Sequence, residues 1–183
     1  IQPIMEATMR ARDQRKPVMP TAATRDAVSW WKHCLQRISA GDDTWHGEAI
    51  IPIKTKTDVS AMGDAGSEWG MGGHDDTSYY KAAWTPEMWQ SVQRAKGPSS
   101  LHMETMQLLL MARIMGHSWH KHLVVVELDS LGLTQTLRRG RHKDPRINDI
   151  LKELALHQIE HGFELKGAWI WRCWNEAADA LSK

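Results

Sequence analysis

The sequence predicts an α/β protein in which helices flank one mixed sheet. The β-branched run HLVVVELDS (122–130) is typical of a buried parallel strand. Helical patterns lie on both sides of it, and a second strand-like segment, FELKGAWIW (163–171), follows. The order of strands, helix, strand, helices, strand and helix therefore predicts a mixed sheet with right-handed crossovers between parallel strands.

The composition is that of one globular domain. The chain has 183 residues, 42% hydrophobic and 25% charged, with a formal net charge of +1. We expect no membrane partner, because no apolar run is long enough to cross a bilayer and the first residues contain no secretory segment. Cys34 and Cys173 cannot make a disulfide framework, which predicts an intracellular, reducing compartment.

Residues 1–45 are expected to form an amino-terminal arm and a helix. Residues 1–24 hold three prolines and little periodicity, as in an extended arm or the tail of a preceding domain. Residues 25–39 have one apolar stripe at helical spacing. Its members are Val28, Trp31, Leu35 and Ile38. We expect residues 46–183 to form the sheet domain.

Glycine-rich strands are expected to open this domain. Residues 48–64 resemble a strand that Pro52 interrupts and that ends at Asp64. Residues 68–84 indicate two more strands, joined by a tight turn and a bulge. The run GDAGSEWGMGG (63–73) fits a hairpin, a phosphate cradle or a close approach to a ligand.

Helices with recognisable ends follow. GPSS (97–100) is a break that leads into a helix over 101–116, and a turn-length helix is expected at 131–140. Methionines at helical spacing in this region are interpreted as core filler. They are Met103, Met106, Met111 and Met115.

The two last helices also carry end signals. Residues 144–162 have Asp144 as N-cap, Pro145 at the first helical position and Gly162 after the end. Asn175 is expected to cap the closing helix, NEAADALSK.

Four carboxylates stand where the pattern does not favour charge. Asp64 and Asp129 end predicted strands. Glu104 lies in the first turn of an apolar helix, and Asp179 lies in the first turns of the last helix. Such positions can converge on one edge of an α/β sheet, where ligands tend to bind. Four converging acids repel one another unless oxygen-preferring cations, Mg²⁺ or Mn²⁺, neutralise them, and two such ions can flank a phosphodiester.

Each acid also has a structural interpretation. Asp64 fits a turn residue before glycine, and Glu104 fits a capping-box acid with Ser100. Asp129 fits a cap of the helix that follows it, and Asp179 fits a surface charge. The four together, in this order of elements, favour the metal site.

Four segments carry a family resemblance. DAGSEWGMGG is close to a run D-A-S-G-S-W-G-C-G-A, and SSLHMETMQLLLMARIMGHSW is an acid-led helix ending in glycine and tryptophan. HLVVVELDSLGLTQTLRRG is a valine-rich block, and the closing NEAADALSK is close to N-x-x-A-D-x-L-S-R. From about residue 28 to the end, the chain resembles the ribonuclease H domain of tyrosine-recombinase retroelements, the DIRS and Ngaro types.

The resemblance implies an RNase H-like fold, with a mixed five-stranded sheet flanked by helices, and hydrolysis of the RNA strand of an RNA–DNA hybrid. Carried over residue by residue, Asp64, Glu104, Asp129 and Asp179 match the four positions that hold two Mg²⁺ (or Mn²⁺) ions. Asp58 is a rival for the first position, but the spacing to the following glycines favours Asp64. The same match favours the hairpin over the phosphate cradle. The implied partners are an RNA–DNA hybrid or RNA, and a reverse transcriptase domain.

The chain also departs from the family pattern. Gly63 and Gly66 replace a hydroxyl residue and a serine, and Ser130 follows Asp129 in place of asparagine. WIWR (169–172) replaces a His-x-Pro-Gly stretch. No Tyr-x-Asp-Asp polymerase signature is present, so we expect either a piece of a retrotransposon polyprotein or a domesticated domain.

Three hypotheses follow. The retained acids favour an active endonuclease. The changed neighbours favour a catalytically inactive module that serves as an RNA-binding or structural subunit of a large ribonucleoprotein, such as a mitochondrial ribosome. An exonuclease or integrase-like relative fits the acids but not the closing motif.

Two further features have alternative interpretations. The basic run RRGRHK (138–143) fits either a phosphate-tracking segment or a solvated loop. Its candidate nucleic-acid-binding residues are Arg138, Arg139, Arg141 and Lys143. Trp84, Trp89 and Trp119 fit either base stacking or packing positions, and we favour packing.

Overall fold

The computed structural model describes residues 21–40, 58–93 and 99–183. The chain divides into two compact units, Ile1–Glu48 and Ala49–Lys183, and each is described by itself. The boundary expected between residues 45 and 46 stays a prediction. The expected arm and the part of the first strand before residue 58 lie outside the described residues.

The first unit contains the helix α2 (Ala22–Ser39), which confirms the helical pattern expected there. Its apolar stripe carries Val28, Trp31 and Leu35, and all three side chains are exposed. Within the part of the chain that the structure describes, no helix is both long and apolar enough to cross a membrane.

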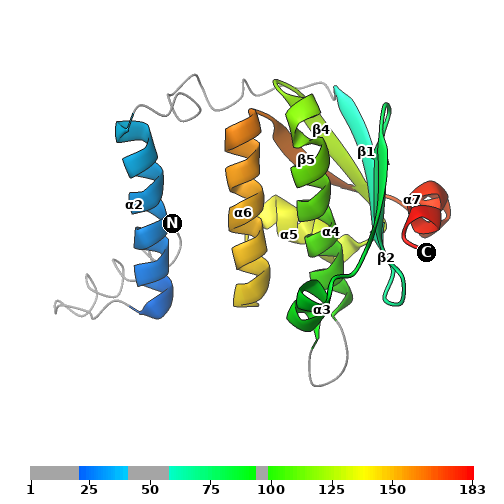
Figure 1. Ribbon diagram of the computed structural model, residues 1–183, viewed down its shortest axis with the longest axis horizontal. Helices are drawn as coiled ribbons and strands as arrows, with labels where there is room; N and C mark the ends of the chain where they lie inside the picture. Colours follow the sequence, from blue (N-terminus) through cyan, green and yellow to red (C-terminus); the bar gives the residue numbers. More distant parts are fainter. Residues whose placement is uncertain (1–20, 41–57, 94–98) are drawn as a thin grey trace. The chain divides into compact units, whose positions relative to one another are not determined.

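One five-stranded mixed sheet organises the second unit (Figure 1). Strands β1 (Val59–Ala65), β2 (Gly70–Asp75) and β3 (Tyr79–Ala83) form an antiparallel meander. Strands β4 (Leu123–Leu128) and β5 (Glu164–Trp169) continue the sheet in parallel beside β1, in the order β3-β2-β1-β4-β5. The expected mixed sheet is confirmed, and the glycine-rich run is a hairpin between β1 and β2.

Helices cover both faces of this sheet. Their bounds are α3 (Pro86–Val92), α4 (Ser100–Met115), α5 (Leu131–Arg139), α6 (Pro145–His161) and α7 (Glu176–Leu181), with 3₁₀ turns η2 (Gly116–Trp119) and η3 (Arg172–Trp174). Helix α4 packs on β1 from one face, with α6 behind it, whereas α7 packs on β1 and β2 from the opposite face (Figure 1). Helix α3 was not predicted, although Thr85 caps it and Pro86 occupies its first position.

The helix ends agree with the sequence in part. Asp144 caps α6, and Gly162 ends it in the left-handed conformation, as expected. Asn175 occupies the expected N-cap position of α7, but its side chain makes no capping hydrogen bond. The Asn175 side chain is instead buried, and neither of its polar atoms has a hydrogen-bond partner among the described residues.

Glycines let the helices approach the sheet closely. A Cβ atom on Gly63 would lie 2.0 Å from Gln107 Nε2 of α4. A Cβ atom on Gly72 would lie 2.4 Å from Leu181 Cβ of α7. On each face of the β1–β2 hairpin, a different helix therefore packs directly against a glycine.

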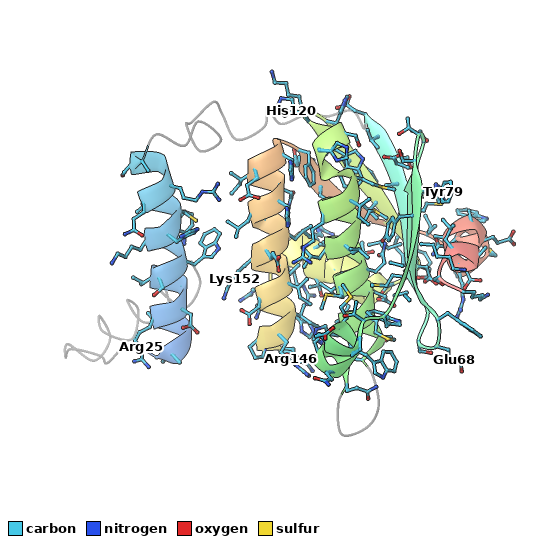
Figure 2. The ribbon with its side chains drawn as sticks, in the orientation of Figure 1. Arg25, Glu68, Tyr79, His120, Arg146 and Lys152 are labelled. Carbon is cyan, nitrogen blue, oxygen red and sulfur yellow. The ribbon has the colours of Figure 1, made fainter. Side chains whose placement is uncertain are left out.

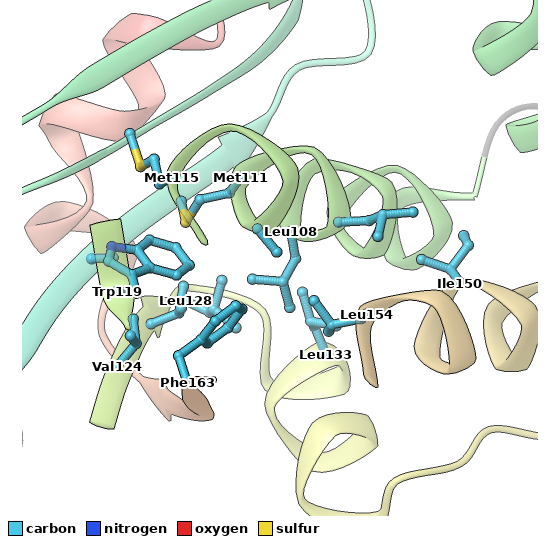
Figure 3. Packing of buried hydrophobic residues seen from close by; sticks show 14 of the residues in the cluster. Leu108, Met111, Met115, Trp119, Val124, Leu128, Leu133, Ile150, Leu154 and Phe163 are labelled. Carbon is cyan, nitrogen blue, oxygen red and sulfur yellow. The ribbon is translucent and has the colours of Figure 1, made fainter. Parts of the chain in front are cut away.

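The hydrophobic core lies between the sheet, α4 and α6 (Figure 3). Met111 and Met115 are buried in it, and the ring of Trp119 packs edge-on against Phe163 with centroids 5.3 Å apart. Outside the core, Trp84 donates a hydrogen bond to the Gly66 carbonyl across the hairpin. These contacts agree with the expected packing roles of the methionines and tryptophans.

Candidate active site

Two of the four predicted acids come from neighbouring parallel strands. Asp64 lies near the end of β1, and Asp129 directly follows β4. The strands are parallel with Met62 opposite Glu127, so two residues further along, Asp64 is level with Asp129. Both carboxylates therefore stand at the carboxyl-end edge of the sheet.

Glu104 reaches the same edge from α4. This helix begins at Ser100, with Ser99 as its N-cap, so Glu104 lies in the second turn rather than the first. A hydrogen bond from Ser130, the residue that caps α5, stabilises the Glu104 carboxylate. The capping-box interpretation of Glu104 is wrong, because Ser99 is the N-cap of α4 and the third helical position is His102. The capping interpretation of Asp129 is wrong, because Ser130 caps α5.

Asp179 reaches the site from α7. Ser182, less than one turn further, donates a hydrogen bond of 2.6 Å from Oγ to Asp64 Oδ2. The Asp179 carboxylate pairs with Lys183 and lies 3.9 Å from the guanidinium of Arg172. Ser182 and Arg172 were not among the predicted site residues; the only sequence signal for them is their position in the closing stretch.

Burial, and then electrostatic repulsion within this group, raise the pKa of two of its carboxylates, Glu104 and Asp129. Burial raises the pKa of Glu104 to about 7, and the charges of Asp129 and Asp64 contribute to the rise against the opposing hydrogen bond from Ser130. The pKa of Asp129 is raised as well, first by burial and then by Asp64, while Arg172 lowers it. Asp179 adds a smaller upward contribution to Asp129. The structure thus places the four predicted acids close enough for Asp64 and Asp179 to influence the pKa of Asp129, and for Asp64 and Asp129 to influence that of Glu104.

A divalent cation fits this donor set. Glu104 Oε2 is buried and has no hydrogen-bond partner among the described residues. An unpartnered buried carboxylate oxygen, close to Asp129, whose pKa is also raised, is stabilised by a bound cation. Carboxylate oxygens are the ligands preferred by Mg²⁺ and Mn²⁺.

Asp58, the rival for the first position, lies at the other end of β1. Its backbone N–H donates to the Leu123 carbonyl, and its Oδ2 accepts a 3.0 Å hydrogen bond from Leu123 N–H. Leu123 starts β4, whereas Asp129 follows the end of that strand. The length of the strand therefore separates Asp58 from the acid cluster.

Exposed tryptophans border the acids. Trp169 donates a hydrogen bond from Nε1 to the Asp129 carbonyl, and its ring contacts that of Trp171 at a centroid distance of 4.8 Å. Trp171 and Trp174 are 59% and 67% exposed. These aromatic faces and Arg172 take the place of the histidine stretch that the family resemblance would supply.

The basic run lies at the far end of α5. Arg138 and Arg139 form its last turn and are exposed, and Gly140 follows in the left-handed conformation. Because α5 starts after Asp129 and rises about 1.5 Å per residue, these cations stand roughly 13 Å along the helix from the acids. They are therefore not part of the carboxylate cluster itself.

Comparisons with known proteins identify the fold. No family model and no curated protein matches the chain. Among solved structures, LC11-RNase H1 in complex with an RNA/DNA hybrid matches with a TM-score of 0.52 and 17% identity, over 67% of this chain and 92% of that one. RNase H1 from the archaeon Halobacterium salinarum matches with a TM-score of 0.48, at the same identity and coverage. At 17% identity the match to LC11-RNase H1 shows the fold alone, and the second unit has an RNase H-like fold.

Proposed function

We propose that the domain is a metal-dependent endonuclease that hydrolyses the RNA strand of RNA–DNA hybrids. The convergence of Asp64, Glu104, Asp129 and Asp179 at one sheet edge carries this proposal. The raised pKa of Glu104 and of Asp129, to which burial and the neighbouring carboxylates contribute, supports a site built to hold positive charge. The structural neighbour crystallised with an RNA/DNA hybrid supports the class of substrate.

The chain's own residues have distinct parts in this reaction. Bound at the carboxylates, two Mg²⁺ or Mn²⁺ ions would supply Lewis acids for the attacking water and the leaving oxygen. Asp64 and Asp129 would bind the ion that activates the attacking water. Glu104 and Asp179 would complete the ligand set and orient the scissile phosphate, while the hydrogen bond from Ser182 fixes the Asp64 carboxylate.

The substrate would extend from the acids toward the basic run. Exposed cations provide most of the affinity for a nucleic-acid backbone, which suits Arg138, Arg139, Arg141 and Lys143. The sequence blocks around Asp64 and Asp179 support an origin in a retroelement of the DIRS or Ngaro type. Such an origin would imply a reverse transcriptase domain as a partner.

The test is cleavage of a labelled RNA–DNA hybrid with Mg²⁺ or Mn²⁺. We expect the wild type to cleave only the RNA strand and Asp129→Asn to lose the activity while keeping its fold. Asp76→Asn, which removes an exposed carboxylate outside the cluster, should cleave like the wild type. Cleavage by Asp129→Asn at the wild-type rate, or none by a folded wild type, would refute the proposal.

A non-catalytic module is the second candidate, and one observation favours it. The Asp179 carboxylate already has internal cationic partners, Lys183 and Arg172, which compete with a metal ion for its oxygens. Such a domain would serve a large ribonucleoprotein as an RNA-binding or structural subunit. It would bind RNA or the hybrid without cleaving either, and Asp129→Asn would leave that binding unchanged.

A further inference from the structure

A second group of potential metal ligands lies at the carboxyl end of α6, away from the acid cluster. His157, Glu160 and His161 are spaced i, i+3 and i+4, so their side chains share one side of the helix. One ligand atom from each lies within 4.8 Å of the other two. The two imidazole rings are parallel, with centroids 5.9 Å apart and an interplanar angle of 1°.

The histidine at the start of this group has an unused ring nitrogen. Nδ1 of His157 is shielded from solvent and makes no hydrogen bond to any described residue. The nearest carboxylate oxygen, Glu160 Oε2, lies 3.9 Å away, which is too far for a hydrogen bond. A buried nitrogen without a partner costs free energy, and a metal ion placed between the two groups would satisfy it.

The backbone around the group is held firmly. The carbonyl of His161 is 3.0 Å from His120 Nδ1, and Figure 2 shows His120 beside this end of α6. Gly162 closes the helix in the left-handed conformation, and Phe163 directly after it is fully buried in the core. Ligands on a fixed last turn bind an ion with little loss of conformational entropy.

We propose that His157, Glu160 and His161 form a binding site for a transition-metal ion of the Zn²⁺ class. Imidazole nitrogens suit Zn²⁺, Ni²⁺ and Cu²⁺, whereas Mg²⁺ prefers sites made only of oxygen. Zinc needs its ligands about 2.0–2.2 Å away, and small side-chain rotations can bring atoms with this spread onto one ion. Three protein ligands leave a fourth position for water.

The site would differ from the acid cluster in both ion and role. The carboxylates at the sheet edge select a hard cation for phosphodiester chemistry, whereas the α6 site would clamp the last turn of a core helix. An ion that binds only the folded state stabilises it by mass action. The proposal does not depend on nuclease activity and stands whether or not the domain cleaves a hybrid.

The test is calorimetric titration of the whole chain with Zn²⁺ in the presence of excess Mg²⁺. We expect one Zn²⁺ per chain and a raised melting temperature. The variants His157→Ala and His161→Ala should each weaken the affinity about tenfold or more, because even groups that only support a ligand typically contribute that much. Asp129→Asn and His33→Ala, which alter the acid cluster and an exposed histidine of α2, should bind like the wild type.

A second measurement on the unmodified sequence covers the case in which a variant does not fold. Zn²⁺ should protect His157 and His161 from acylation by diethyl pyrocarbonate, mapped by mass spectrometry, while the exposed His117 still reacts. The proposal is refuted by a wild type that shows no saturable Zn²⁺ binding or by protection confined to other histidines. Full affinity in a folded His157→Ala/His161→Ala variant would refute it as well.

Discussion

At the scale of single residues, Glu104 has the most strongly raised pKa among the carboxylates that the structure describes. Burial moves its pKa from 4.5 in the unfolded chain to about 7 in the folded domain. Between these pH values the folded state keeps a proton that the unfolded state releases. Without metal, the stability contributed by Glu104 is therefore full below pH 4.5 and is lost as the pH rises through 7.

This sign gives the first prediction. With a chelator present, the free energy of unfolding of the wild type should fall between pH 5 and pH 8. The fall should exceed that of Glu104→Gln by on the order of 2 kcal/mol. Added Mg²⁺ should restore stability at pH 8 more than at pH 6, because it needs the ionised carboxylate. Urea unfolding across this pH range measures both effects. The same pH slope in Glu104→Gln would contradict the assignment.

Asp75 illustrates a carboxylate with the opposite role. Its Oδ2 accepts a 2.9 Å hydrogen bond from the buried indole of Trp119, and its Oδ1 accepts bonds from Thr77 and Ser78. Although burial opposes them, these hydrogen bonds hold the pKa of Asp75 below its usual value. The residue therefore acts as a structural anchor between the end of β2 and the core.

The second prediction is that Asp75→Ala destabilises the domain by about 2–4 kcal/mol, because it leaves the Trp119 N–H buried without a partner. The neighbouring exposed variant Asp76→Ala should stay within about 0.5 kcal/mol of the wild type. Denaturant unfolding of the two variants side by side is the measurement. Equal stability of both would show that the buried hydrogen bonds contribute little.

At the scale of elements, the site depends on how closely α7 can approach the sheet. A Cβ atom on Gly72 would lie 2.5 Å from the Leu181 carbonyl carbon and 2.8 Å from its oxygen. Gly72 pairs with Asp64 across the hairpin, and α7 carries Asp179. The lack of a side chain at Gly72 therefore lets the helix that carries Asp179 pack directly on the strand position opposite Asp64.

The third prediction follows from this contact. Gly72→Ala should cost about 1–3 kcal/mol of stability, because backbone must move, and should weaken Mg²⁺ binding as Asp179 is displaced. Gly132→Ala is the matched control, since its Cβ would meet nothing closer than 3.6 Å. In the helix α5, that alanine should be neutral or stabilising by up to about 1 kcal/mol. Unchanged Mg²⁺ affinity in Gly72→Ala would show that the position of α7 does not affect Mg²⁺ binding.

The basic end of α5 provides the fourth prediction. Replacing Arg138 and Arg139 by glutamine should weaken hybrid binding and make its salt dependence shallower, by about one unit of slope per lost phosphate contact. The double variant Arg113→Gln/Lys152→Gln removes the exposed Arg113 of α4 and the half-buried Lys152 of α6, which pair with Glu153 and Asp149, and serves as the control. Fluorescence anisotropy over a range of salt concentrations measures the slopes. Equal slopes in both variants would favour the solvated-loop interpretation.

At the scale of the whole molecule, local patterns predicted most of the elements and long-range contacts completed the site. The apolar run before Asp129 and the glycine hairpin after Asp64 determine strand ends, and strand ends are visible in a sequence. The hydrogen bond from Ser182 to Asp64 joins residues 118 positions apart, and no periodicity in the sequence predicts it. Helix α3 was missed although Thr85 and Pro86 are ordinary start signals.

The same limit explains the α6 metal ligands. His157 and His161 lie within a helix whose ends were predicted correctly, and their i, i+4 spacing was visible. What the spacing could not convey is that the Nδ1 of His157 is shielded and unpartnered, because that depends on what surrounds the end of α6. A property that depends on burial cannot be inferred from helical spacing and requires the folded structure.

The fifth prediction concerns the division of the chain into two units. If the RNase H-like unit folds independently, a fragment of residues 46–183 should unfold cooperatively and bind Mg²⁺ like the full chain, because the sheet, its helices and the four acids all lie within it. Circular dichroism during thermal unfolding and Mg²⁺ titration of both proteins make the comparison. Hybrid cleavage by the fragment at the full-length rate would assign the first unit a role outside catalysis. A fragment that aggregates, or that folds but loses Mg²⁺ binding, would instead show that residues 1–45 stabilise the acid cluster and that the boundary is misplaced.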